Sequence, residues 1–150
     1  MAVSVKELLC DLKPEEKARY ESNLDSLMIK ILGADTLARK LFEEHTGSSF
    51  MIYHPNLAYL ARDYGLEEIP VEFEGKEPPP SRMKELIDIA RERNIETIFV
   101  QKEFDSKNAN AIAGEIGAEV KIIDPLSSEW YKATVEIITA LHSSIGKSPK

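Results

Sequence analysis

Apolar residues recur every three or four positions through the first 46 residues, which is the spacing of one face of a helix. The stripe includes Leu8, Leu12, Leu24, Leu27 and Ile31. Pro14, followed by two glutamates, marks a new helix start, because proline is tolerated in the first turn and acidic side chains there favour the helix dipole. The pattern predicts a short helix, and then one long helix or two in tandem from Pro14 to about His45.

After Gly47 the spacing changes, and short apolar runs alternate with helical patterns. The predicted strands are 50–53, 69–73, 97–100 and 120–123. The predicted helices are a short one ending at Gly65, then 83–90, 106–116 and about 128–141. This alternation predicts an α/β fold, with a mostly parallel sheet of about four strands and helices on both faces. Three regions follow: a long connecting helix region (1–46), an α/β lobe (47–145) and a frayed polar tail (146–150).

Composition narrows the class of protein. A chain of 150 residues with 43% hydrophobic residues is typical of one soluble globular domain. The net charge of −7 disfavours nucleic acid as a partner and suits a cation ligand. The single cysteine, Cys10, excludes an internal disulfide and a cysteine-rich zinc cluster. No apolar run approaches the roughly 20 residues of a membrane span, and the opening does not read as a secretory signal.

Candidate chemistry lies where the predicted strands end, because ligands of an open parallel sheet bind beyond the carboxyl ends of its strands. His54 follows the first strand, Glu103 the third and Asp124 the fourth. Imidazole and carboxylate are ligand types for zinc or manganese. Other interpretations are open: a lone histidine is often a hydrogen-bonded loop residue, an Asp-Pro pair is often a turn, and Glu103 is interpreted as a solvated loop charge.

Patterns typical of enzymes are missing from the sequence. There is no glycine-rich phosphate loop and no Gly-x-Ser-x-Gly elbow. Adjacent glutamates such as Glu43 and Glu44 do not face each other on a helix, so they are poor acid–base couples. The other two histidines, His45 and His142, lie near predicted helix ends and are not interpreted as ligands. The chain is therefore predicted not to be an enzyme.

Several segments, in order along the chain, carry a resemblance to a known family. They are FMIYHPNLAYLARDYGL (50–66), the proline-rich connector and helix start (77–86), the strand and helix at 98–113, and IIDPL (122–126). Upstream, Leu12-Lys13-Pro14 with Tyr20 and Asn23 resembles the start of a rigid connecting helix. Together they resemble the C-terminal lobe of the zinc- or manganese-type metal receptors of ABC importers, which bind an ion between two lobes.

The resemblance implies a function and a set of partners. By position, His54 and Asp124 correspond to the metal ligands of the C-terminal lobe, so the chain is expected to carry about half of a zinc or manganese site. Glu103 has no ligand counterpart. The implied partners are an N-terminal lobe and a membrane permease, with no nucleic acid and no direct membrane insertion. The implied location is extracytoplasmic, periplasmic or at the cell surface.

Two explanations are open for the absent N-terminal lobe and signal peptide. The chain is a fragment of a longer receptor, or a natural half-length relative that has given up metal transport. The first is favoured because the opening coincides with a lobe boundary. In the second, the chain is an interaction or dimerisation module, with a homodimer formed through the long helix by Leu24, Leu27 and Ile31.

Overall fold

The computed structural model describes residues 1–72 and 76–145, and the predicted frayed tail at 146–150 lies outside them. The chain forms two compact units, Met1–Leu37 and Ala38–Lys150. Within the described residues, no helix is both long and apolar enough to cross a membrane.

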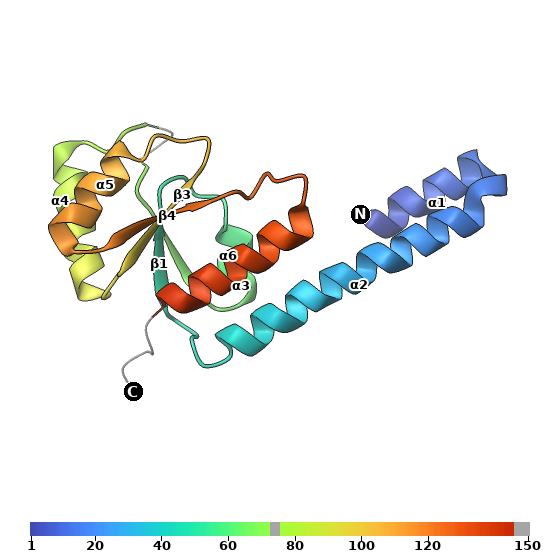
Figure 1. The fold of residues 1–150 in the computed structure, drawn as a ribbon, viewed down its shortest axis with the longest axis horizontal. Coiled ribbons are helices and arrows are strands. Elements are labelled where there is room, and N and C mark those ends of the chain that lie inside the picture. Colours follow the sequence, from blue (N-terminus) through green and yellow to red (C-terminus); the bar gives the residue numbers. More distant parts are fainter. Residues whose placement is uncertain (73–75, 146–150) are drawn as a thin grey trace. The chain divides into compact units, whose positions relative to one another are not determined.

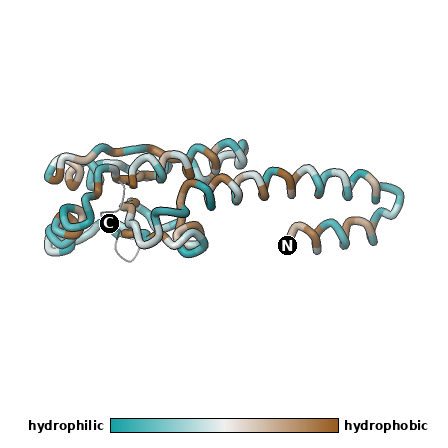
Figure 2. The backbone as a smooth tube through the Cα atoms, turned by 90° about the horizontal axis from the view of Figure 1, so that it is seen from below, coloured by the Kyte–Doolittle hydropathy of each residue, from teal (hydrophilic) through white to brown (hydrophobic). Residues whose placement is uncertain are grey.

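The first unit is helical. Helix α1 (Ala2–Leu12) is joined by the 3₁₀ turn η1 (Pro14–Glu16) to α2 (Lys17–Phe42), which runs on into the second unit. Figures 1 and 2 show α1 folded back alongside the first half of α2. The turn at Pro14 confirms the predicted helix start, while α2 ends at Phe42, three residues before the predicted end. No residue of α1 is buried.

The second unit contains a four-stranded sheet. Its strands are β1 (Ser49–Ile52), β2 (Glu67–Pro70), β3 (Thr97–Gln101) and β4 (Glu119–Ile123). They lie in the order β2-β1-β3-β4, and every neighbouring pair is parallel. The α/β class and the four-stranded parallel sheet are therefore confirmed.

Helices cover both faces of this sheet. Figure 1 shows α4 (Pro80–Glu92) and α5 (Lys107–Ile116) on one side, and α3 (Ala58–Asp63) and α6 (Trp130–Ser144) on the other. Successive strand residues point to opposite faces, so each strand contributes to two apolar layers. On the α4–α5 side, Met51, Ile98 and Val100 pack with Leu86 and Ile112. Both faces of the central strands are therefore buried, as expected of a parallel sheet.

The opposite layer contains two large aromatic residues. Phe50 of β1 and Phe99 of β3 are 1% and 0% exposed, and their rings meet edge to face with centroids 6.4 Å apart. By strand alternation they point away from Met51 and Ile98, toward the α3–α6 side. This layer extends toward the carboxyl edge of the sheet, where the polar residues of the candidate site begin.

One strand differs from its predicted position. Strand β2 was predicted at 69–73 but begins at Glu67. Only its buried positions, such as Ile69, carry an apolar signal, because β2 is an edge strand and its glutamates face partly into solvent. The backbone pairing with β1 continues past Pro70, since Glu72 N–H donates to the Tyr53 carbonyl at 2.9 Å.

Gly65 ends the turn between α3 and β2 with a φ of +70°, a conformation that side chains rarely adopt. A Cβ atom there would lie 3.2 Å from the Thr46 methyl group. We expect Gly65→Ala to lower the free energy of unfolding by about 1–2 kcal/mol, measured by urea denaturation. Gly114→Ala is the control: it lies inside α5 with open space around its Cβ position, so it should raise stability by up to about 1 kcal/mol. Equal effects of the two changes would contradict this explanation.

Candidate metal centre

The carboxyl ends of the four parallel strands place both predicted ligands at one edge of the sheet. His54 lies two residues beyond β1, and Asp124 directly follows β4. Strand β3 lies between them, so their backbones are about two strand spacings, roughly 10 Å, apart. The sheet order thus sets the distance that the two side chains would have to span toward a shared ion.

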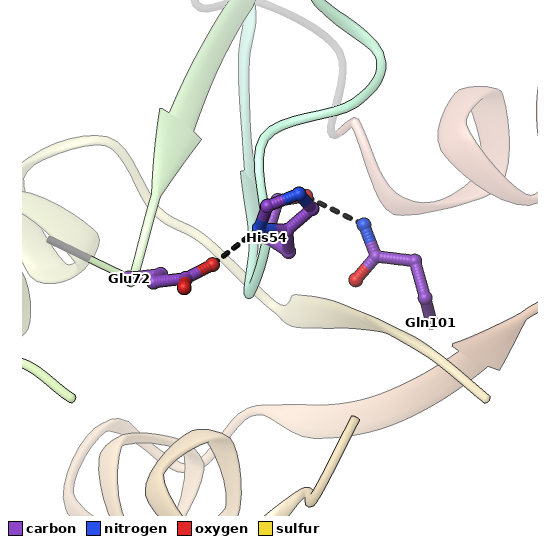
Figure 3. Close-up of polar contacts among 3 residues, drawn as sticks. All are labelled: His54, Glu72 and Gln101. Carbon is purple, nitrogen blue, oxygen red and sulfur yellow. Dashed lines mark hydrogen bonds and ion pairs between the residues drawn. The ribbon is translucent and has the colours of Figure 1, made fainter. Parts of the chain in front are cut away.

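Two side chains hold the His54 ring, and Figure 3 shows the first of them, Glu72. Its Nδ1 atom forms a hydrogen bond with a carboxylate oxygen of Glu72, which follows β2. The Phe104 ring stacks on the imidazole with centroids 4.8 Å apart and planes 18° from parallel. No hydrogen bond occupies Nε2 among the described residues, and the side chain is 40% exposed. The ring is therefore held in a defined orientation on a partly exposed side chain, with Nε2 left for another partner.

Gln101, at the end of β3, holds the backbone of the same residue. Its amide Nε2 donates to the His54 carbonyl oxygen at 2.5 Å (Figure 3), and the residue is only 1% exposed. The other amide atom, Oε1, is buried without a hydrogen-bond partner in the described part of the chain. Gln101 therefore connects the central strand β3 to the loop that carries His54.

Glu68, on β2, holds the next part of that loop. Its carboxylate accepts the Leu57 backbone N–H at 2.8 Å. Burial raises the pKa of Glu68, and the backbone hydrogen bonds from Leu57 and Asn56, with the nearby His54, oppose that shift. Two carboxylates therefore contact the loop after β1. Glu68, on β2, binds the backbone of the loop, and Glu72, just after β2, binds the His54 ring.

The raised pKa of Glu68 predicts a pH dependence of stability. A carboxyl group with a raised folded-state pKa contributes stability at low pH, and loses it as the pH rises through that pKa. We expect the stability of Glu68→Gln, compared with the unchanged chain, to increase as the pH rises from 4 to 7. Urea denaturation at several pH values measures this difference, with Glu67→Gln as the exposed neighbour control. A pH-independent difference would count against burial as the cause.

Asp124 has a different environment. One carboxylate oxygen pairs with the Lys102 ammonium group, and the other, Oδ1, is buried with no hydrogen-bond partner in the described residues. The hydrogen bond to Asp124 raises the pKa of Lys102, so the ammonium group stays charged beside the carboxylate. A cation that used Asp124 would coordinate Oδ1 or displace Lys102.

The structure thus does not bring the two predicted ligands into contact. His54 pairs with Glu72 and Asp124 with Lys102. Within residues 1–72 and 76–145, no group of three or more His, Cys, Asp or Glu side chains could hold a metal ion. The remaining two histidines, His45 and His142, meet edge to face with ring centroids 5.2 Å apart. His45 precedes β1 and so lies at the opposite end of that strand from His54.

Glu72 and Gln101 were not singled out in the sequence. Gln101 directly follows the predicted strand at 97–100, so the carboxyl-edge rule would have selected it if amide side chains had been considered together with metal ligands. Glu72 was missed because β2 was predicted to continue to residue 73, which placed Glu72 inside the strand. A correct end for β2 would have added Glu72 to the same edge.

A parallel sheet that gathers His54, Glu72 and Gln101 at its carboxyl edge is the architecture of a binding lobe. Comparison with known proteins identifies the kind of lobe. The sequence model of a family described as "Zinc-uptake complex component A periplasmic", ZnuA, matches residues 1–143, and the chain belongs to this family. The predicted resemblance is therefore confirmed. The description is of an uptake component rather than an enzyme, in agreement with the prediction.

Individual relatives agree with the family match. The high-affinity zinc uptake system protein ZnuA of Bacillus subtilis is 30% identical over 115 residues, which cover 75% of this chain. A crystal structure of ZnuA is 32% identical with a TM-score of 0.89 over 95% of this chain. A zinc-bound ZnuA lacking residues 138–173 is also 32% identical, with a TM-score of 0.87 over 98% of this chain.

The match covers only part of each relative. The chain spans 36% of the Bacillus subtilis protein and 56% of each of the two ZnuA chains in the solved structures. The shared part is a lobe and its preceding helix.

Proposed function

We propose that the chain is the zinc-binding lobe of an ABC-importer solute receptor, in which His54 and Asp124 supply about half of the ion's ligands. The observation that carries the proposal is that Nε2 of His54 has no hydrogen-bond partner among the described residues, on a side chain that is 40% exposed and held through Nδ1 by a carboxylate. Imidazole nitrogens that bind metals have this arrangement, with the second ring nitrogen hydrogen-bonded to a carboxylate or carbonyl. Family membership supports the same assignment.

Zinc is the ion that the donor set favours. Imidazole is a borderline donor that suits zinc, whereas manganese prefers oxygen ligands. A structural zinc site has about four ligands, so two donors from this lobe leave about two for another lobe. The proposed role is then to hold the ion between two lobes and to deliver it to a membrane permease. The proposed location is extracytoplasmic, as the family description indicates for its members.

The test is a calorimetric titration of zinc and of manganese into the metal-stripped chain. We expect one zinc ion per chain, bound weakly because only two ligands are present, and weaker binding of manganese. Binding of manganese as tight as that of zinc, or no zinc binding at millimolar concentration, would contradict the proposed donors. The same titration of a longer chain with a second lobe should show tighter zinc binding.

Dimerisation is a second candidate function, and it depends on the first unit. Of the residues predicted to dimerise, Ile31 is 40% exposed, whereas Leu24 and Leu27 are half-buried. Other large apolar side chains of this unit are more exposed, including Leu8 at 60%, Leu12 at 69% and Ile29 at 72%. Exposed apolar surface of this kind favours association with another protein surface. Analytical ultracentrifugation over a range of concentrations should then show self-association that Leu12→Glu weakens. A monomer at all concentrations would exclude this candidate.

A further inference from the structure

The hydrogen bond between His54 and Glu72 joins residues that are 18 positions apart, from loops that follow neighbouring strands. The carboxylate is well enclosed, because the Glu72 side chain is only 10% exposed while the His54 side chain is 40% exposed. Backbone pairing holds Glu72 in place, since its N–H donates to the Tyr53 carbonyl at 2.9 Å. A largely buried carboxylate thus holds the Nδ1 side of a ring that is partly exposed.

This contact determines which nitrogen of the ring carries the proton. A neutral imidazole has one N–H donor and one lone-pair acceptor, and an ionised carboxylate can only accept. With an ionised Glu72, this contact requires the proton on Nδ1 and leaves the lone pair on Nε2. Since a metal ion needs a lone pair, and the hydrogen bond of one nitrogen sets the state of the other, the side chain is prepared for coordination through Nε2.

We propose that Glu72 is the positioning residue of the metal site: it accepts the Nδ1–H of His54 and so holds Nε2 as the donor atom for zinc. This inference rests on the proposed function. Two further contacts limit the motion of the ring. Phe104 stacks on its face, and Gln101 donates to the His54 carbonyl at 2.5 Å. Among the described residues, Glu72 is the only side chain hydrogen-bonded to the imidazole itself.

Glu68 offers a comparison that separates hydrogen bonding from charge. It lies near His54 and acts on it through charge, but its carboxylate contacts the backbone of Asn56 and Leu57 instead of the ring. If negative charge near His54 were the whole effect, Glu68→Gln and Glu72→Gln would weaken zinc binding equally. If Glu72 fixes the ring proton, only changes at Glu72 alter the tautomer of His54.

The experiment combines ¹⁵N NMR of the histidine ring nitrogens in the metal-free chain with calorimetric zinc titration. In the unchanged chain, His54 should be the Nδ1–H tautomer. Glu72→Ala should shift His54 toward the other tautomer and weaken zinc binding about 10- to 100-fold, the range typical of losing a hydrogen-bond partner of a metal ligand. Glu72→Gln, which retains an acceptor oxygen, should restore part of both. Glu68→Gln should leave the tautomer unchanged.

Several outcomes would overturn the inference. An Nε2–H tautomer in the unchanged chain would do so without any variant, even if Glu72→Ala fails to fold. Unchanged zinc affinity and tautomer in a folded Glu72→Ala chain, shown by circular dichroism, would also do so. A different result would contradict the proposed function. If His54→Ala leaves zinc binding unchanged, the proposed function is wrong, whatever the tautomer of His54 in the unchanged chain.

Discussion

Replacing His54 by alanine is expected to weaken zinc binding by more than about 100-fold, beyond the 10- to 100-fold range typical of losing a residue that only supports a ligand. The reason is that the change removes a donor atom itself. Nε2 of His54 is an imidazole nitrogen at the carboxyl edge of the sheet with no hydrogen-bond partner among the described residues. Calorimetric titration of the metal-stripped variant measures the loss. Asp124→Ala should weaken binding as well, because its carboxylate is the second proposed donor.

His142→Gln provides the matched control for this prediction. It also removes an imidazole, but from a ring that packs against His45 and Phe42. Zinc affinity should therefore stay within a few-fold of that of the unchanged chain. Equal losses in the His54 and His142 variants would show that zinc binds histidines without selection. Unchanged affinity in both the His54 and Asp124 variants would remove these residues from the site.

Phe99→Ala should lower the free energy of unfolding by about 3–5 kcal/mol, the usual cost of removing a buried aromatic ring from a core. Phe99 is 0% exposed on the central strand β3, and its ring meets Phe50 edge to face. Removal of the ring leaves a cavity under the sheet that the paired strands cannot close. Because domains of this size are stable by only about 5–15 kcal/mol, the variant should be close to unfolding. Urea denaturation monitored by circular dichroism measures the change.

Leu126→Ala tests whether burial causes that loss. Leu126 is also a large apolar residue, but it is 77% exposed in the loop after β4. Its removal should change stability by no more than about 0.5 kcal/mol, as is usual for surface substitutions. A loss at Leu126 comparable to that at Phe99 would contradict the core that the structure describes.

The elements of this fold could be predicted because their signals are local. The strands at 97–101 and 119–123 lie where apolar patterning placed strands, and the turn at Pro14 lies where a helix start was predicted. The alternation of strand and helix predicted a parallel sheet, which the pairing confirms. Strand β2 was shifted by two residues at its start, since its polar glutamates at an edge carry no apolar signal.

The candidate site could be predicted only in part. The carboxyl-edge rule selected His54 and Asp124 from the sequence, because in a parallel sheet every strand ends at the same edge. Their roles as ligands stay a prediction. The rule does not specify which strands are neighbours, and that order depends on how the helices pack on both faces.

The sequence by itself therefore determined the α/β class, the positions of most elements and the edge at which chemistry would lie. Only the tertiary structure decided which side chains meet there. The order β2-β1-β3-β4 puts Glu72 beside His54 and inserts Gln101 between His54 and Asp124. Helix and strand signals come from residues a few positions apart, whereas these contacts join residues 18 and 47 positions apart. Such pairings are selected by packing of the whole lobe, so no local pattern encodes them.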